Sequence, residues 1–388
     1  MNALDADIDL LDLTPFSASR DHLLFRELRG RDAIHFNPEP DGPGFWSLVR
    51  YDHVASAARD NVRFLSGFGT QIKNRRAEGD GHPSVHNSDP PLHGTLRNIV
   101  LPCLSRASIM KREARIAEIT RTLIEGVERD AAFDFVERIA VKLPMMVIAD
   151  VLGVPAEDSE ALVDWANLMS DVRASNEQQA TARSELFRYF RLLSEHKRNH
   201  PADDVATALV AAGMHEEALD AYFMLLTVAG NETTRFLLTG GLAQLIRQPG
   251  EFARVAQDRT LIDRLVEEMC RFVSPVAHMR RTTAEAIDLH GVSLPKGSKV
   301  VLWFASANHD ERKFGDPDRL VLDRTANAHL GFGLGSHFCV GAHLARLETR
   351  LFLNAMFDAV RSLELLAEPQ RLPSNWFTGW TSMQVRWS

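Results

Sequence analysis

The segment from Gly331 to Gly341 constrains this chain most, and it reads GFGLGSHFCVG. Four glycines and one cysteine fall within eleven residues, directly before a run with helical spacing. Because glycine has no Cβ, this backbone can fold tightly against a flat or bulky neighbour. Cys339 stands just before the expected helix, where free N–H groups and the helix dipole favour a thiolate. The segment therefore predicts a loop that presents sulfur to a metal.

Three other interpretations fit parts of this loop. A phosphate-binding loop also places glycines before a helix, but its Lys-Ser/Thr pair is missing and no clear strand precedes it. A zinc site at His337 and Cys339 would need two further Cys or His ligands nearby, and none is evident. A free buried cysteine in a glycine-rich turn is an ordinary feature, but it leaves Phe332 unexplained.

Composition excludes several classes of protein. With 45% hydrophobic and 25% charged residues, the 388-residue chain is expected to be globular. A net charge of -8 gives no electrostatic reason to expect nucleic acid or an anionic membrane as partner. Cys103, Cys270 and Cys339 are too few for a disulfide framework, which fits a reducing compartment. No export signal or membrane-length apolar run is present, so we expect a cytoplasmic protein.

Apolar spacing predicts a mainly helical protein. Residues 98–366 show repeated spacings of three and four, and the longest helix is expected over 216–248, before Pro249. Alternation predicts a strand at 45–49, and turn signals predict further strands within 286–301.

The sequence contains no repeat and no Gly/Ser-rich linker that would separate two domains. We expect a single domain over residues 1–388, with residues 1–20 flexible. The tail over 372–388 is expected to form a hairpin.

The long helix carries a glycine at its centre. Gly230 costs the helix ~1 kcal/mol relative to alanine. Ala229 and Gly230 would keep one face thin enough for a ligand to approach the backbone, while a threonine hydroxyl could bond a carbonyl one turn back. An ordinary kinked buried helix is the alternative.

The full loop pattern resembles the haem-binding loop of the cytochrome P450 family. The matching residues are Phe332, Gly333, His337, Cys339 and Gly341. The resemblance extends from about residue 45 onward and implies a mainly α fold with small β-sheets. Haem b would be held between the long central helix and the cysteine loop. By resemblance, Cys339 is the axial ligand of the haem iron, and its electron density favours O–O cleavage.

A second motif, Glu268-Met-Cys-Arg271, resembles the Glu-x-x-Arg helix of the same family. Its two charged side chains lie one turn apart on one face, which alone would be an ordinary surface pair. Here Ser-Pro-Val at 274–276 and Gly-Asp-Pro-Asp-Arg at 315–319 follow in the family's order. The resemblance therefore implies a buried ionic lock formed by Glu268, Arg271 and Arg319.

Haem brings two propionates, whose charges must be neutralised in a mostly apolar site. The family pattern assigns His93, Arg97, Arg281 and His337 to them. His93 and Arg97 stand at i and i+4, so they would share one face of a helix. Because Arg280 is next to Arg281 in the chain, either of the two arginines could be the one that contacts a propionate.

The implied reaction is insertion of one atom of dioxygen into an apolar small molecule, by hydroxylation or epoxidation. Glu232 and Thr233 match the family's acid–alcohol pair for proton delivery, which argues against a peroxide-driven relative. The chain is filled by the oxygenase, so electrons should come from NAD(P)H through a ferredoxin reductase and ferredoxin. We expect a monomer without a nucleic-acid or membrane partner.

A ferredoxin is expected to dock on a basic patch near the cysteine, although the same side chains could simply be solvated helix faces. The patch comprises Lys111, Arg112, Arg115, His343, Arg346 and Arg350.

The pocket walls of the family fall on mostly apolar positions of this chain, which favours an apolar ligand. These positions are Val85, Ala229, Val276, Ala277 and Phe377, with Trp165, Leu168 and Met169 in nearby helices. His278 and the polar stretch 71–86 leave room for an anchoring hydrogen bond. The sequence Ala-Gly-Asn-Glu-Thr-Thr resembles that of bacterial members of the family that act on terpenoids, steroid side chains and other lipids. Aromatic or biosynthetic-intermediate substrates, and a non-catalytic haem gas sensor, remain open.

Overall fold

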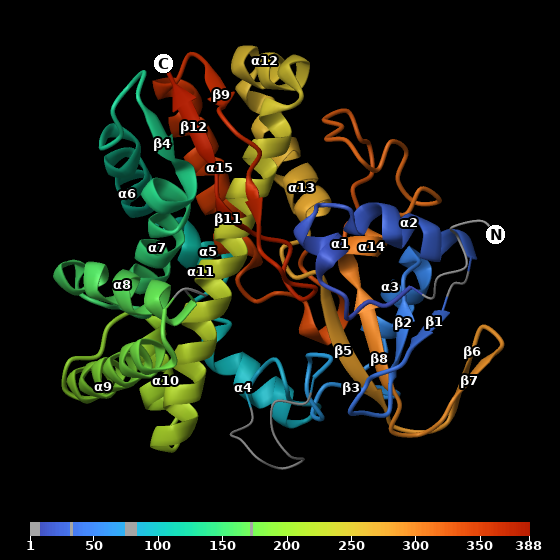
Figure 1. Ribbon diagram of the computed structural model, residues 1–388. Helices are drawn as coiled ribbons and strands as arrows, with labels where there is room; N and C mark the ends of the chain where they lie inside the picture. The colour runs from blue at the N-terminus through green and yellow to red at the C-terminus, as the bar shows by residue number, and fades with distance from the viewer. Residues whose placement is uncertain (1–7, 32–33, 74–83, 171–173) are drawn as a thin grey trace.

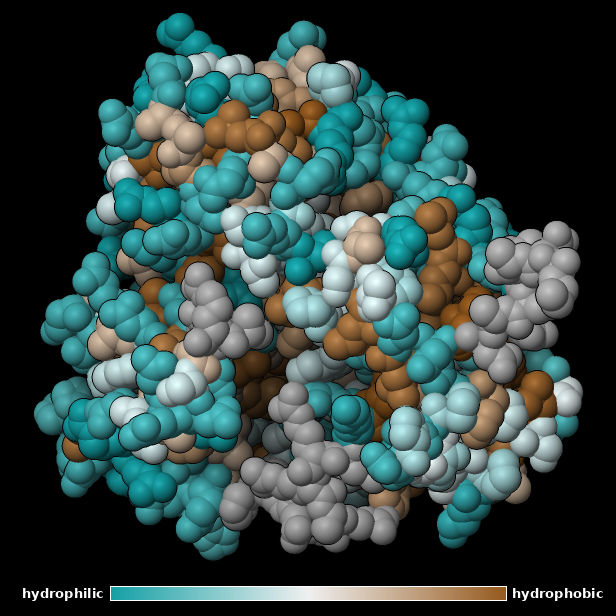
Figure 2. All heavy atoms as spheres, in the orientation of Figure 1, coloured by the Kyte–Doolittle hydropathy of each residue, from teal (hydrophilic) through white to brown (hydrophobic). Residues whose placement is uncertain are grey.

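A computed structural model describes residues 8–31, 34–73, 84–170 and 174–388. Helices α6 to α11 gather on one side of the molecule, and the largest sheet lies on the other (Figure 1). On the face drawn in Figure 2, hydrophobic atoms collect in a hollow between these two sides. The mainly α architecture with small sheets agrees with the sequence-based prediction.

Helix α11 (Glu216–Ile246) is the longest helix, with 31 residues. Glu216 and Glu217 in its first turn complement the positive end of the helix dipole. It ends just before Pro249, which opens α12 (Pro249–Gln257) because proline suits the first turn of a helix. The predicted helix over 216–248 is therefore confirmed to within two residues. It packs against α7 (Lys142–Leu152) and α13 (Ile262–Val273).

The remaining helices surround this centre. They are α1 (Thr14–Ser17), α2 (Asp21–Arg31), α3 (Tyr51–Arg59), α4 (Leu92–Val100), α5 (Arg106–Met110), α6 (Glu113–Glu125), α8 (Ser159–Ser170), α9 (Asn176–Asn199), α10 (Val205–Ala211), α14 (Phe304–Ala307) and α15 (Ala342–Ala359). Short π or 3-10 turns cover Val136–Ala140, Ala156–Asp158, Arg259–Leu261 and Gly335–His337.

The largest sheet has five strands in the order β1-β2-β8-β5-β3. Strands β2 and β8 run parallel, with Trp46 opposite Val300, and the other neighbours are antiparallel. Strand β2 confirms the prediction at 45–49. The bounds are β1 (Ile34–Asn37), β2 (Phe45–Leu48), β3 (Phe64–Leu65), β5 (His278–Thr283) and β8 (Lys299–Trp303).

Three small sheets complete the fold, in the orders β6-β7, β4-β12-β9 and β10-β11. The hairpin β6-β7 and strand β8 confirm strands within 286–301. The bounds are β4 (Ala132–Asp134), β6 (Ile287–Leu289), β7 (Val292–Leu294), β9 (Leu363–Leu365), β10 (Gln370–Arg371), β11 (Trp380–Ser382) and β12 (Gln384–Trp387).

Both predictions about the chain ends need correction. The tail forms two strands but no hairpin, since β11 pairs with β10 while β12 pairs with β4 and β9. The chain changes sheets at buried Met383, whose carbonyl accepts from the Phe135 N–H. At the other end, Leu10 and Phe16 are buried, so the flexibility expected over 1–20 is wrong from residue 8 onward. Residues 1–7 lie outside the described residues.

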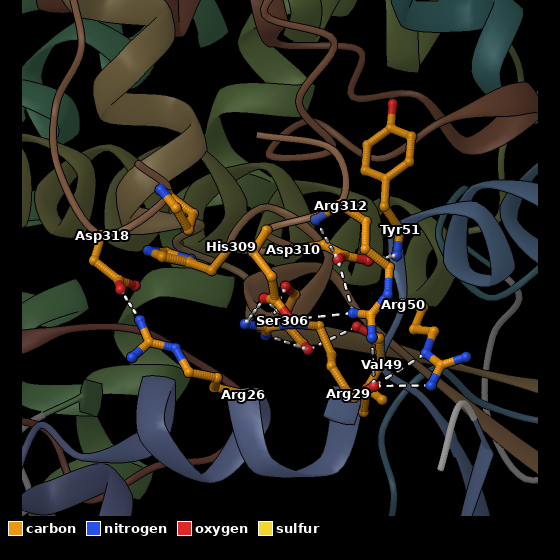
Figure 3. Close-up of polar contacts among 12 residues, drawn as sticks. Arg26, Arg29, Val49, Arg50, Tyr51, Ser306, His309, Asp310, Arg312 and Asp318 are labelled. Atoms are coloured by element: carbon orange, nitrogen blue, oxygen red, sulfur yellow. Dashed lines mark hydrogen bonds and ion pairs between the residues drawn. The ribbon is translucent and has the colours of Figure 1, made fainter. Parts of the chain in front are cut away.

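A buried polar network ties α2 to the end of the largest sheet (Figure 3). Arg29, 1% exposed, donates to the carbonyl of Ser306 at 3.2 Å and to its hydroxyl at 3.1 Å. It also forms a 2.9 Å ion pair with Glu311. The Ser306 hydroxyl in turn donates to the Val49 carbonyl at 2.7 Å. These contacts fix the segment after α14, which leads towards the cysteine loop.

Candidate functional site

A cavity lies between α11, the cysteine loop and the end of β5. On α11 its lining residues include Leu226, Ala229, Gly230, Thr233 and Leu237. Their spacings of three and four place them on one face of the helix. The cavity is therefore bounded by the two elements that the sequence singled out.

Gly230 serves helix packing as well as the cavity wall. A Cβ at this position would lie 2.9 Å from Cγ1 of Ile148 on α7. The glycine therefore makes room for a side chain of the protein. The prediction from the sequence had considered only the approach of a ligand. The predicted threonine bond is present, because Thr233 Oγ1 donates to the Ala229 carbonyl at 2.7 Å.

The two members of the acid–alcohol pair face different surroundings. Thr233 lines the cavity, whereas Glu232 is not among the described residues of its lining. The Glu232 carboxylate lies 3.9 Å from the guanidinium of Arg235, one turn along the helix. Thr234, which sequence analysis missed, does line the cavity.

The glycines of the cysteine loop fit it against the rest of the chain. A Cβ at Gly331 would lie 2.5 Å from the Cys270 carbonyl oxygen at the end of α13. Gly335 has φ +74°, and a Cβ there would lie 2.7 Å from the Ala58 carbonyl oxygen of α3. The large neighbour expected from the sequence is thus, at these two positions, backbone of the protein itself.

Cys339 opens onto the cavity directly before α15, which has Gly341 as its N-cap. Its N–H donates to the Phe332 carbonyl at 2.8 Å, which holds the loop closed. Burial raises the pKa of the Cys339 thiol, although the Gly341 N–H and the charges of Arg97 and Arg346 act in the opposite direction. The helix terminus therefore acts together with these two arginines in favouring the thiolate, and burial acts against it.

Four basic side chains meet at one corner of the cavity: His93, Arg97, Arg281 and His337. The rings of His93 and His337 lie 4.1 Å apart, and His93 Nε2 is buried without a hydrogen-bond partner among the described residues. Burial lowers the pKa of Arg281 to about 10, and burial together with Arg281 lowers that of His337 to about 3. Two guanidinium groups, Arg97 and Arg281, which form no ion pair within the described part of the chain, together with two imidazole rings, fit an anionic ligand.

The neighbouring Arg280 points elsewhere. It donates to the Phe68 carbonyl at 2.5 Å and to the Gln71 carbonyl at 3.3 Å. Arg281, not Arg280, lines the cavity. Of these two neighbouring arginines, Arg281 is therefore the one that reaches the corner of the cavity.

These residues fit haem. Cys339 offers sulfur to an iron, and the basic corner, with an unpartnered nitrogen at His93, offers donors to two propionates. When bound, haem supplies the iron that activates dioxygen. The zinc alternative finds no support in the described part of the chain, where no three His, Cys, Asp or Glu side chains gather into a metal site.

The ionic lock forms with a different third member. Arg271 pairs with Glu268 at 2.8 Å, as predicted, and both side chains are buried. The second arginine on Glu268 is Arg324, at 2.9 Å, so the prediction of Arg319 is wrong. Arg319 contributes only its carbonyl to Arg271, at 2.6 Å, and its side chain is exposed. The arginine five residues later was the signal that sequence analysis missed.

The predicted substrate pocket is partly right. Val85, Ala229 and Val276 line the cavity, but Ala277 and Phe377 do not belong to its described lining. Successive residues of an extended chain point to opposite sides, so Ala277 joins a core cluster instead. Phe377 packs on aromatic rings at 236 and 376. Also outside this lining are Trp165, Leu168, Met169 and His278; residues 74–83 of the polar stretch are outside the described chain.

Several lining residues were missed. Those on α11 and α15 could have been found by extending the helical period from Ala229 and Gly341, whereas the others come together only in the folded chain. They include Thr70, Leu104, Pro144, Ile148, Leu225, Leu226, Thr234, Leu237, Met279, Phe304, Leu344 and Glu348. His86, at the end of the polar stretch 71–86 expected at the pocket, also lines the cavity.

The expected basic patch is largely neutralised by the protein itself. Each of its lysine and arginine side chains forms an ion pair, which weakens the field that a ferredoxin would meet. The pairs are Lys111–Asp203, Arg112–Asp150, Arg115–Glu118, Arg346–Glu267 and Arg350–Glu113. The docking patch expected from the sequence therefore consists, at these five positions, of paired charges.

None of the helices in the described residues combines the length and the apolar character required to cross a membrane.

Comparisons with known proteins give the family. The family model for cytochrome P450 matches residues 203–375. The linalool 8-monooxygenase of Pseudomonas putida is 33% identical over 385 residues, covering 94% of this chain and 95% of that protein. The methyl-branched lipid omega-hydroxylase of Mycobacterium tuberculosis is 34% identical over 386 residues, covering 94% and 90%. The steroid C26-monooxygenase of Rhodococcus jostii is 32% identical over 383 residues, covering 93% and 80%.

Solved structures agree along nearly the whole chain. A Mycobacterium marinum cytochrome P450 in complex with pseudoionone superposes with a TM-score of 0.91 and 31% identity, covering 98% of both chains. A P450 involved in the biosynthesis of vancomycin-type antibiotics gives a TM-score of 0.91 and 30% identity, covering 98% of this chain and 99% of that one. The chain therefore belongs to the cytochrome P450 family and is a P450 monooxygenase with haem b as its cofactor.

Proposed function

We propose that this monooxygenase hydroxylates or epoxidises an apolar small molecule of the terpenoid, steroid or lipid type. The observation that carries this proposal is the apolar lining of the cavity onto which Cys339 opens, which includes Val85, Leu226, Leu237 and Val276. Apolar walls with few polar groups favour apolar ligands, whose burial supplies most of the binding free energy. The printed activities of the relatives, on linalool, steroids and methyl-branched lipids, point to the same class.

Individual residues have distinct proposed roles. Cys339 holds the haem iron, and the basic corner neutralises the propionates. Thr233 orients water in the cavity through its hydroxyl, while Glu232 supplies protons from beside Arg235. Glu268, Arg271 and Arg324 hold the segment before the cysteine loop, because their buried charges satisfy one another and nearby backbone groups.

Electrons are proposed to come from NAD(P)H through a ferredoxin reductase and a ferredoxin, to a monomeric cytoplasmic enzyme whose residues 1–388 form one catalytic domain. The ion pairs of the basic patch support a docking contact of modest strength, since paired charges attract a partner only weakly.

Two measurements test the proposal. The reduced, carbon-monoxide-bound haem protein should show a strongly red-shifted Soret band that is lost in Cys339→Ser. Holoenzyme should then give a substrate-induced spin shift, and a hydroxylated or epoxidised product with ferredoxin and its reductase, for members of a terpenoid, steroid and fatty-acid panel. A normal carbon-monoxide spectrum without product from any panel member would reject the substrate class. Gas binding without turnover of any substrate would instead support a sensor.

A further inference from the structure

The loop before α4 fixes the protonation of a histidine that lies on the cavity wall. Ser84 Oγ lies 2.7 Å from His86 Nδ1 and donates its proton to Asn87 Oδ1 at 2.8 Å. Asn87 Oδ1 also accepts from the Ser84 N–H at 2.6 Å, so two donors identify this atom as the amide oxygen. A serine hydroxyl has one proton, which here goes to Asn87. His86 Nδ1 must therefore carry a proton and donate it to Ser84.

The other ring nitrogen consequently has a free lone pair. His86 lines the cavity together with Thr70 and its chain neighbour Val85, close enough to Arg281 and His337 for their charges to interact. Burial, reinforced by Arg281, lowers the pKa of His86 to about 4, so the ring is neutral near pH 7. Nε2 of a neutral Nδ1–H ring can only accept a hydrogen bond. Its complement is an O–H or N–H donor.

The haem propionates do not suit this nitrogen. A carboxylate only accepts hydrogen bonds, and His93, Arg97, Arg281 and His337 already supply donors at the corner. To donate as well, His86 would have to become an imidazolium close to Arg281, at a buried position where charge is disfavoured. The substrate, which occupies the rest of the cavity, is the better match.

We propose that His86 Nε2 accepts a hydrogen bond from a hydroxyl group of the substrate, so that the enzyme acts on apolar alcohols and His86 orients them over the cofactor. This inference rests on the apolar substrate class proposed above. It adds a single polar anchor to an otherwise apolar contact surface, and such an anchor restricts which carbon of the substrate can face the reacting centre.

The main test compares matched ligands. Pairs of an alcohol and its methyl ether on monoterpene, fatty and sterol skeletons are titrated into holoenzyme, and the dissociation constants are read from the spin-state shift. Wild type should bind the alcohol about tenfold more tightly than the ether, the upper range for one neutral hydrogen bond. His86→Phe should abolish that preference, and His86→Gln, whose amide oxygen can accept, should restore part of it.

The control is Val85→Ala, which changes the neighbouring wall without removing an acceptor and should weaken alcohol and ether equally. An alcohol preference that survives in His86→Phe would overturn the proposal. Loss of bound haem in His86→Phe, with no alcohol preference in wild type, would assign the ring to the cofactor instead.

A second measurement does not depend on finding a ligand. Nitrogen-15 NMR of the histidines in the diamagnetic, carbon-monoxide-bound enzyme should show His86 at pH 7 as the neutral Nδ1–H tautomer, assigned by comparison with His86→Gln. An imidazolium or an Nε2–H ring would overturn the inference. Absence of spin shifts for every skeleton, with the expected tautomer present, would reject the apolar substrate class and with it the substrate contact.

Discussion

Glu268 accepts a hydrogen bond from Arg324 at 2.9 Å although 56 residues separate them in the chain. The same carboxylate pairs with Arg271 and accepts from the Val321 N–H at 2.8 Å. Burial raises the pKa of Glu268, but these partners outweigh it and hold the pKa below its usual value. The lock is thus one carboxylate shared by two arginines and the backbone that leads to the cysteine loop.

Removal of Arg324 should therefore be costly. Arg324→Leu leaves a buried carboxylate with one arginine fewer, and we expect unfolding to become easier by ~2–3 kcal/mol. Arg319→Leu, which removes an exposed side chain, is the matched control and should change the free energy by less than ~0.5 kcal/mol. Urea unfolding of both variants measures the difference, and equal losses would contradict the assignment of Arg324.

Alanine at Gly331 should damage the cysteine loop. Its Cβ would meet the Cys270 carbonyl oxygen at 2.5 Å, and that backbone atom cannot swing aside. We expect a loss of about 1–3 kcal/mol and weaker haem retention. Gly250→Ala, where a Cβ meets no atom within 4 Å, should be neutral or stabilising by up to ~1 kcal/mol. Unfolding curves and haem-to-protein ratios check both, and an unchanged Gly331→Ala protein would refute the contact.

The stability of the protein should fall in mild acid because of His309. Burial, followed by the charge of Arg271, lowers the pKa of this histidine to about 3 in the folded state. Below about pH 6.5 the unfolded chain binds the proton and the folded chain does not, so stability falls as pH drops towards 3 and is unaffected above 6.5. The slope from this group is about 1.4 kcal/mol per pH unit.

His309→Asn should reduce the pH dependence of the free energy of unfolding between pH 6 and 5 by about that amount. His343→Asn, at an exposed position, should leave the slope as in wild type. Denaturant unfolding at several pH values provides the measurement. A slope that His309→Asn does not alter would mean that this ring is protonated in the folded state.

Thr233 should control how efficiently electrons produce product. Its hydroxyl lines the cavity, so Thr233→Ala should divert dioxygen to hydrogen peroxide and lower product formed per NAD(P)H by about tenfold. Thr227→Ala removes an equivalent hydroxyl, which bonds the Phe223 carbonyl at 2.8 Å but lies outside the described cavity lining, and should leave the ratio unchanged. The yields of product and of peroxide per NAD(P)H measure this effect. If Thr233→Ala formed as much product per NAD(P)H as wild type, the proposed role of Thr233 would be excluded.

Lys111 is the most informative side chain for ferredoxin docking. Its partner Asp203 is 73% exposed and Lys111 itself 66%, so their pair contributes little to stability. Lys111→Glu should slow reduction at low salt by about two- to fivefold and make it less salt-sensitive. The matched control is Lys296→Glu, on the turn after β7, which changes the net charge by the same amount. It should have little effect on the rate of reduction. Stopped-flow reduction that responds equally to both variants would place docking elsewhere.

Much of the site was predictable because it lies within single elements. His93 and Arg97 share one face of α4, and Ala229 and Thr233 share one face of α11, since the helical period sets those relations locally. The cysteine loop was equally predictable, because its positive-φ glycines and its cysteine stand in one short segment.

What remained depends on contacts between distant segments. Val276 lines the cavity and Ala277 does not, although both are apolar. Which of the two faces the cavity depends on how this segment pairs with Phe377, and the sequence does not show that pairing. The basic patch likewise looked free until the folded chain placed carboxylates beside it, as with Arg346 and Glu267 at 2.6 Å.

By itself the sequence determined the helical class and the cysteine loop, because each is encoded by local spacing and residue type, whereas the set of basic residues for an anionic cofactor was implied by the resemblance to a family. Only the tertiary structure decided that Arg324 completes the lock and that His86, held by Ser84, lies on the cavity wall. Both depend on which groups surround a side chain after burial, when desolvation makes every missing or additional partner count.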